Sequence, residues 1–291
     1  MDGSFSEADA LASTRLQAVK YFDVVAIVIL VFEYCLTFNL EVSLIWPSRW
    51  SLTKILYILS RYPAFFDVPL VLYYLNPTVS IEHCAQINTA IAAGNVFGIA
   101  IAEAIFVLRT YALSGRQRTV LITFGTLYSV FLVATVSMMA IFLRNMIYSP
   151  PLPHVPGCNL TGGPFTLVGL SFILVLLNET ALMSYTLWIG VKTYRHTTSP
   201  LVTTLYRDGV TYYVFLFLGS AANVAILIGA PKQLRELLNT PLRVLHSVLS
   251  TRALLHVRKA ERERSERTVA THTTSAGSVH FANDLTIMSR G

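Results

Sequence analysis

The sequence predicts an all-α fold, a transmembrane bundle of seven helices with its N-terminus outside the cell and its C-terminus in the cytoplasm. The 291 residues are 54% hydrophobic and 13% charged, whereas soluble domains are about 45–50% apolar and about 25% charged. Residues 119–143 and 209–230 contain no Asp, Glu, Lys or Arg, and 164–191 contains only Glu179. Each run provides the roughly 20 apolar residues that a helix needs to cross a bilayer. None shows the alternating pattern of a membrane β-barrel.

The first two spans lie near the N-terminus. We expect Tyr21–Leu44 to act as the insertion signal, because residues 1–20 are charged and lack the apolar core of a cleavable signal peptide. The second span, Leu52–Leu75, contains Pro63 and Pro69, and proline is the usual cause of a sharp kink in a helix. The sequence therefore predicts a bent second helix.

Four longer spans follow, at Cys84–Ala112, Thr119–Leu143, Pro164–Val191 and Asp208–Ala230. The seventh, Leu237–Val257, is less apolar, because it contains Asn239, Pro241, Arg243, His246 and Arg252. An amphipathic helix lying on the membrane surface is the alternative for this last segment.

Lysine and arginine are divided unevenly between the connecting segments. With the N-terminus outside, the cytoplasmic side holds thirteen of them: Arg49, Lys54, Arg109, Arg116, Arg118, Lys192, Arg195, Arg207, Arg258, Lys259, Arg262, Arg264 and Arg267. The outer side holds five: Arg15, Lys20, Arg144, Lys232 and Arg235. Cytoplasmic loops carry an excess of these residues, so this orientation is favoured. Without a seventh crossing the bias would reverse, and the same rule therefore supports that crossing.

The predicted organisation has three parts: an extracellular segment at 1–20, a seven-helix domain at 21–257 and a disordered cytoplasmic tail at 258–291 that is rich in Ser and Thr. The start of the tail, K-A-E-R-E-R-S-E-R, has opposite charges spaced to extend the last helix. We place the chain in the plasma membrane or another membrane of the secretory pathway, with the lipid bilayer as its partner. The isoelectric point near 9.3 reflects the basic inner loops rather than nucleic-acid binding.

Two of the three cysteines lie on the predicted outer side. Cys84 begins the third span and Cys158 lies in the loop after the fourth, whereas Cys35 lies within the first span. The outer side is oxidising, so we predict a Cys84–Cys158 disulfide. Such a bridge would roof a ligand pocket, or it would simply stiffen the bundle. Asn159-Leu-Thr161 is a glycosylation sequon in the same loop, and the sequence leaves its occupancy open.

Several polar side chains are predicted to lie inside the membrane and to face the bundle interior, since lipid exposure of such groups is costly. They are Glu33, Arg61, Asp67, Asn95, Glu103, Asn178 and Glu179. The depths and opposite charges of Arg61 and Glu103 predict a contact between them. The network is either a protonation-sensitive or ligand-coupled switch, or interhelical hydrogen bonds worth about 0.6 kcal/mol each.

The motif L-R-T-Y-A-L ends the third span on the cytoplasmic side. Its Arg109 and Tyr111 are candidates for a conformational switch like that of rhodopsin-like receptors, although Leu108 stands where those receptors carry an acid. The alternative is a basic residue that only stops membrane insertion.

Several short motifs together resemble one known family. They are E-V-S-L-I-W (Glu41–Trp46), K-I-L-Y-I-L-S-R-Y (Lys54–Tyr62), L-R-T-Y-A-L, Y-R-D-G (Tyr206–Gly209) and R-A-L-L-H-V-R. They are similar to a fungal family of multi-pass, seven-helix membrane proteins with an N-terminal domain of unknown function. Such families often have Asp in the middle of the first span, where this chain has Glu33. The resemblance implies seven helices and membrane residence, and it implies no activity.

Three function classes remain open. A receptor-like protein that senses an external ligand, unidentified by the sequence, would use the basic inner loops to bind a cytoplasmic signalling protein. A transporter of small molecules or ions is the alternative, and faintly similar ends of the third and seventh spans hint at a repeat. An intramembrane enzyme is disfavoured, because the chain has neither H-E-x-x-H nor G-x-S-x-G. We predict no catalytic residue, cofactor or metal site.

Overall fold

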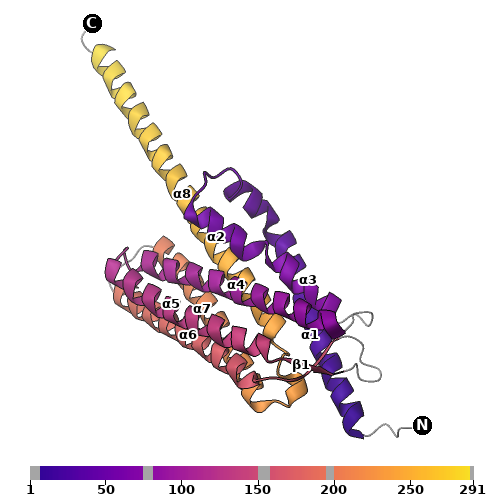
Figure 1. The fold of residues 1–291 in the computed structure, drawn as a ribbon. Helices are drawn as coiled ribbons and strands as arrows, with labels where there is room; N and C mark the ends of the chain where they lie inside the picture. Colours follow the sequence, from indigo (N-terminus) through magenta and orange to yellow (C-terminus); the bar gives the residue numbers. More distant parts are fainter. Residues whose placement is uncertain (1–6, 75–80, 150–157, 195–199, 289–291) are drawn as a thin grey trace.

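The computed structural model describes residues 7–74, 81–149, 158–194 and 200–288, and it is a bundle of long helices (Figure 1). The helices are α1 (Glu7–Leu44), α2 (Leu52–Arg61), α3 (Ala64–Tyr74), α4 (Ile81–Leu113), α5 (Arg118–Arg144), α6 (Phe165–Tyr194), α7 (Pro200–Gly229) and α8 (Asn239–Met288). Strands β1 (Ile147–Ser149) and β2 (Asn159–Gly162) pair antiparallel, and a short 3₁₀ helix, η1 (Lys232–Leu234), precedes α8.

Six helical stretches among the described residues are long and apolar enough to cross a membrane: Ala10–Leu44, Leu52–Tyr74, His83–Leu113, Arg118–Arg144, Phe165–Lys192 and Val210–Gly229. They match the first six predicted spans. Large apolar side chains such as Phe32 on α1, Val133 on α5 and Ile228 on α7 are more than half exposed, which suits a lipid environment and not water. The chain is therefore a multi-pass membrane protein.

The predicted bend in the second span is confirmed. Helix α2 ends at Arg61, and α3 begins at Ala64, so the break falls at Pro63. Proline has no backbone N–H, and its ring clashes with the carbonyl of the preceding turn, so it interrupts a helix. Pro69 instead lies inside α3, which continues past it.

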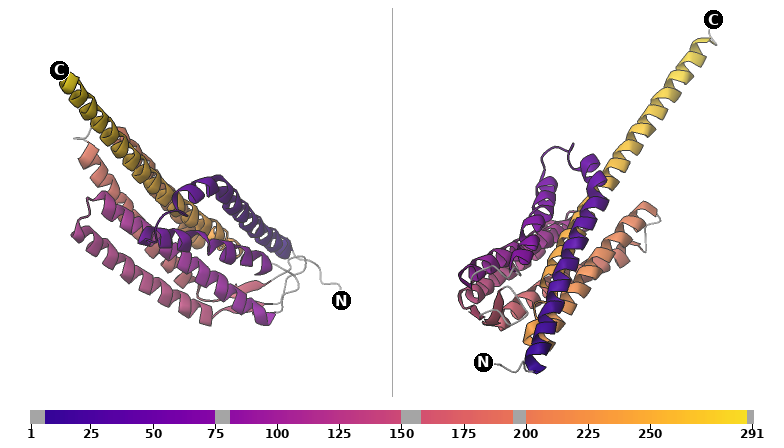
Figure 2. Two further views of the ribbon diagram at one scale, coloured as in Figure 1. Left: turned by 90° about the horizontal axis from the view of Figure 1, so that it is seen from above. Right: turned by 90° about the vertical axis from the view of Figure 1, so that its right-hand side faces the viewer.

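Helix α8 is the least apolar of the predicted spans, yet it lies at the centre of the bundle, in contact with α1, α2, α3, α4 and α7 (Figures 1 and 2). Its buried side chains include Arg243, His246 and Ser250, none of which is measurably exposed. Neighbouring helices shield these groups from lipid, so their polarity carries little penalty. This central position favours a helix enclosed by the bundle over one lying on the membrane surface, and its full crossing of the bilayer stays a prediction.

The two ends of the chain are more helical than composition suggests. Helix α1 begins at Glu7, well before the predicted membrane boundary at Tyr21. Helix α8 continues to Met288, through a segment that composition predicts to be disordered, and Figure 1 shows its last turns projecting beyond the other helices. Opposite charges one turn apart support its exposed part, as in the Arg258–Glu261 pair at 3.6 Å.

The β1–β2 hairpin is tethered to the end of the bundle where α3 ends and α4 begins. Cys158 forms the predicted disulfide with Cys84, with the two Cα atoms 5.6 Å apart. The Cys158 backbone N–H also donates to the Tyr74 carbonyl at 3.2 Å. Cys35 is a free thiol on the exposed face of α1. The hairpin is therefore fixed over the ends of α3 and α4.

Candidate functional site

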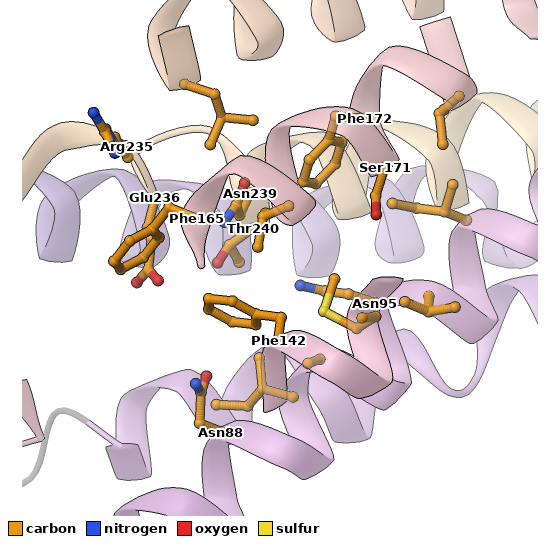
Figure 3. A pocket seen from close by; sticks show the side chains of 18 of the residues that line it. Asn88, Asn95, Phe142, Phe165, Ser171, Phe172, Arg235, Glu236, Asn239 and Thr240 are labelled. Carbon is orange, nitrogen blue, oxygen red and sulfur yellow. The ribbon is translucent and has the colours of Figure 1, made fainter. Parts of the chain in front are cut away.

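A cavity of about 350 Å³ lies beneath the hairpin, between α4, α5, α6 and the start of α8 (Figure 3). This volume falls within the range of about 300–1,000 Å³ that is typical of small-molecule sites. Phe142, Phe165 and Phe172 gather around it and make its walls largely apolar. Asn88 and Asn95 on α4 add isolated polar groups to the lining. A cavity with apolar walls and polar groups among them is suited to an amphipathic ligand.

Charged residues of both signs line the cavity at the hairpin end of the bundle. Lys20 and Asp23 come from α1, and Lys232, Arg235 and Glu236 come from the segment around η1. The Arg235 guanidinium lies 6.0 Å from the centre of the Phe165 ring. Burial, together with the nearby charge of Asp23, raises the pKa of Glu236 to about 7. The ionisation of this carboxyl therefore changes near neutral pH.

At the opposite, inner end the cavity reaches Glu103 on α4 and Asn178 on α6. The Asn178 amide Nδ2 donates to Glu103 Oε2 at 2.7 Å. Both residues are buried, at 4% and 2% exposure. The Asn178 Oδ1 and Glu103 Oε1 atoms have no hydrogen-bond partner, so the polar groups at this end are only partly satisfied.

Behind this end of the cavity, Glu103 joins a buried cluster with Glu179 on α6 and His246 on α8. His246 Nε2 lies 3.0 Å from Glu179 Oε1 and 3.4 Å from Glu103 Oε1. Ser220 on α7 donates its hydroxyl to Glu179 Oε1 at 2.8 Å. The ligand-type atoms of the three residues all lie within 4.8 Å of one another, so four helices meet at this cluster.

A second buried ion pair lies one turn away on α8. Arg243 Nε donates to Asp67 Oδ2 on α3 at 2.9 Å. Two glycines on α4 make room for it, because a Cβ atom at Gly98 would overlap the Arg243 guanidinium and one at Gly94 would overlap Asp67. The G-N-V-F-G run is therefore a packing motif that lets α3 and α8 approach α4.

The predicted Arg61–Glu103 contact is wrong. Arg61 instead pairs with Glu41 on α1, with 2.9 Å between Arg61 Nε and Glu41 Oε2. Glu41 also accepts hydrogen bonds from Trp46 Nε1 at 3.1 Å, Tyr57 Oη at 3.0 Å and Tyr62 Oη at 2.6 Å. Equal depth in the membrane was a poor guide, because α2 packs its Arg61 against α1 rather than α4.

The other predicted polar residues are divided among separate sites. Glu33 forms two hydrogen bonds with Arg252 of α8, both at 2.8 Å. Asn95 lines the cavity, and Asp67 pairs with Arg243. The residues that sequence reasoning missed are Glu41, Arg243, His246 and Arg252. The last three belong to the weakly apolar seventh span, and their clustering there was the available signal.

The two switch candidates lie at the far end of α4 from the hairpin. Arg109 is buried, and its guanidinium lies 5.3 Å from the centre of the Tyr212 ring. Its Nε and Nη1 atoms have no hydrogen-bond partner. Tyr111 is half-buried. The Asn159 side chain lies outside the described part of the structure, so its glycosylation stays a prediction.

Comparison with known proteins identifies one segment of the chain. A family described as "Family of unknown function (DUF6533)" matches residues 21–66. This N-terminal domain covers most of α1, all of α2 and the start of α3, and it contains the Glu41–Arg61 pair. No curated protein matches the chain.

Proposed function

We propose that this chain is a receptor-like protein with seven transmembrane helices that binds an external ligand in the cavity beneath the hairpin. The N-terminus lies outside and the C-terminus in the cytoplasm, as the distribution of Lys and Arg favours. The resemblance in sequence motifs extends the proposal to a fungal family of such proteins. The observation that carries the proposal is the cavity itself, roofed by a disulfide-tethered hairpin and ending at Glu103.

The interior between Glu103 and the far end of α4 favours a receptor over a transporter. Beyond Glu103, the bundle is filled by a hydrophobic core that includes Phe106, Leu182, Tyr213 and Leu216. A transporter must expose its site alternately to both faces of the membrane, which would require this hydrophobic core to open. A receptor needs only a small rearrangement of helices around the ligand.

The ligand that fits this cavity is a small, largely apolar molecule with a polar group. Aromatic walls would hold its body, and the charged residues around η1 would meet its polar end. The basic ends of the cytoplasmic loops, including Arg116 and Arg118, would bind an acidic surface of a signalling protein.

A pair of neighbouring substitutions on α6 tests the ligand site. Ser171 is buried beside the cavity, whereas Leu170 next to it is 42% exposed on the outer face. The full chain in lipid nanodiscs is heated with a panel of small amphipathic compounds. We expect some compounds to raise the melting temperature of the wild type and of Leu170→Phe. The same compounds should not raise the melting temperature of Ser171→Phe, because its phenyl ring would fill part of the cavity. Equal rises in all three proteins would contradict a site in this cavity.

A second experiment separates the receptor from the transporter. A compound that binds is added to cells, and recruitment of cytoplasmic proteins to the chain is measured, alongside flux of the same compound into liposomes that contain the purified protein. Recruitment without flux supports the receptor. Flux that Glu179→Gln abolishes supports the transporter. Epitope tags inserted within 150–157 and after Gly291 should be detected on opposite faces of intact cells.

A further inference from the structure

Three buried side chains from three helices present their ligand atoms to one point inside the bundle. Glu103 Oε1 and Glu179 Oε1 lie 3.4 Å and 3.0 Å from His246 Nε2. A first-row metal ion binds such atoms at about 2.0–2.2 Å, which places the ligands of one ion roughly 3.0–3.5 Å apart. These two spacings match that value, and all three ligand atoms lie within 4.8 Å of one another, so a single ion between the three side chains requires only a small adjustment of the two carboxylates.

The proton position on His246 leaves its other nitrogen free to act as a ligand. His246 Nδ1 lies 2.9 Å from the Leu242 carbonyl oxygen. A carbonyl only accepts hydrogen bonds, so Nδ1 carries the proton. In the neutral ring, Nε2 then has a lone pair that faces two carboxylates. Two acceptors cannot face a lone pair without a cation between them, and a metal ion or a second proton must fill this role.

Each of the three side chains is also oriented by a partner behind it. The Leu242 carbonyl orients His246, the Asn178 amide orients Glu103, and the Ser220 hydroxyl orients Glu179. Outer partners of this kind fix the orientation of metal ligands in most protein metal sites. The chain has no H-E-x-x-H motif, so this arrangement arises from three helices that are far apart in the sequence.

Several buried polar atoms of the cluster and its neighbour Asn178 have no hydrogen-bond partner among the described residues. Glu103 Oε1, Glu179 Oε2 and Asn178 Oδ1 make no hydrogen bond, although the three residues are at most 4% exposed. Buried polar atoms are almost always satisfied. A bound cation, together with the water molecules that complete its coordination, would satisfy these oxygens.

Charge balance favours a divalent ion. With a neutral imidazole, the two carboxylates carry two negative charges in the bundle interior. Arg243, one turn away on α8, is already paired with Asp67 at 2.9 Å, so it does not compensate them. One divalent ion neutralises the cluster with both carboxylates ionised, whereas protons alone neutralise it only if one carboxyl is protonated together with the imidazole.

We propose that Glu103, Glu179 and His246 bind one divalent transition-metal ion of the zinc class at the inner end of the cavity. Imidazole and carboxylate ligands suit Zn²⁺, Co²⁺ and similar ions. The cavity lining includes Glu103 and Asn178, so an open coordination position would face the space that we assign to the ligand. The metal site itself does not depend on whether the chain is a receptor or a transporter.

Metal binding can be measured directly on the full chain in lipid nanodiscs, purified without a histidine tag and stripped with a chelator. Co²⁺ is the probe, because its absorption bands report the ligands that surround it. We expect about one Co²⁺ per chain. Loss of an outer partner typically weakens metal binding about 10–100-fold, and loss of a direct ligand in Glu103→Gln or Glu179→Gln should exceed that range. Glu33→Gln is the matched control, because Glu33 pairs with Arg252 outside the cluster.

His246→Cys adds a gain of signal that does not depend on losing binding. A thiolate ligand gives Co²⁺ an intense charge-transfer band, so this variant should acquire one that the wild type lacks. The proposal is overturned if folded, monodisperse wild-type protein takes up no Co²⁺ or Zn²⁺ near neutral pH, which leaves protons alone in the cluster. It is also overturned if His246→Cys takes up Co²⁺ without this band, or if both glutamine variants bind as tightly as Glu33→Gln.

Discussion

The pair between Glu41 and Arg61 should be a principal source of stability in the N-terminal domain. Glu41 is 1% exposed and accepts three hydrogen bonds in addition to its ion pair with Arg61. Glu41→Ala leaves the Arg61 guanidinium buried without a carboxylate. Breaking a buried ion pair in this way costs about 3–5 kcal/mol. At about 2–4 °C per kcal/mol, the melting temperature should fall by roughly 6–20 °C.

The assay uses the tryptophan that contacts the same carboxylate. Trp46 Nε1 donates to Glu41 Oε1 at 3.1 Å, so its fluorescence should report the loss of this contact before unfolding begins. The melting temperature of Glu41→Ala in nanodiscs is compared with those of the wild type and of Glu33→Ala. The Glu33–Arg252 pair is less buried, at 19% and 39% of the two side chains, so losing it should cost less than losing the Glu41–Arg61 pair.

A double variant separates the ion pair from the general effect of truncation. Arg61→Met removes the buried cation, so Glu41→Gln with Arg61→Met should be less destabilised than Glu41→Ala alone. If Glu41→Ala lowers the melting temperature no further than Glu33→Ala does, the buried cluster is not a major source of stability, and the reasoning fails.

Three further predictions concern the close packing, the hairpin and the charged residues around η1. Gly98→Val should destabilise the fold because its side chain would meet Arg243, whereas Gly125→Val, which has open space around it, should leave the melting temperature within about 2 °C. Cys158→Ser should lower the free energy of unfolding by about 4 kcal/mol, from a loop with a sequence separation of 74, and a reducing agent should then have no further effect. Because the pKa of Glu236 is raised to about 7, its contribution to stability is present below about pH 4.5 and is lost as the pH rises through 7. The melting temperature should therefore fall between pH 5 and 8, and Glu236→Gln should flatten that part of the profile.

The transmembrane character of the chain could be predicted because hydropathy measures contact with lipid directly. Helix α5 contacts mainly α4 and α6 and exposes most of its apolar surface, and its sequence between Arg118 and Arg144 contains no charged residue. Hydropathy is a poor guide to α8, because this helix is surrounded by α1, α2, α3, α4 and α7. Its polar residues Arg243, His246 and Ser250 mark burial within the protein.

The partners of the buried charges could not be predicted, because the sequence gives the depth of a residue in a helix but not the neighbour that it faces. Arg61 and Glu103 have similar depths, yet they lie on helices whose facing sides carry other groups. The Cys84–Cys158 pairing was predictable because two of the three cysteines lay on the predicted outer side, and the third lay within the first predicted span. Where several partners exist at one depth, the rotation of each helix about its own axis decides which of them a side chain meets. That rotation depends on close packing, as at Gly94 and Gly98, which face Asp67 and Arg243.

Helix α8 connects the polar sites that the sequence leaves scattered. Going along it, Arg243 holds α3, His246 meets α4 and α6, Arg252 holds α1, and Arg258 donates to Ser51 at 2.7 Å just before α2. A polar side chain inside a membrane protein finds no competing water, so each contact restricts rotation and sliding of the helix. A ligand or ion that changed the His246 contacts at the end of the cavity would therefore act on a helix that also forms the Arg243–Asp67 and Arg252–Glu33 pairs. Coupling across the bundle then requires movement of α8 alone, rather than a chain of small displacements through the apolar core.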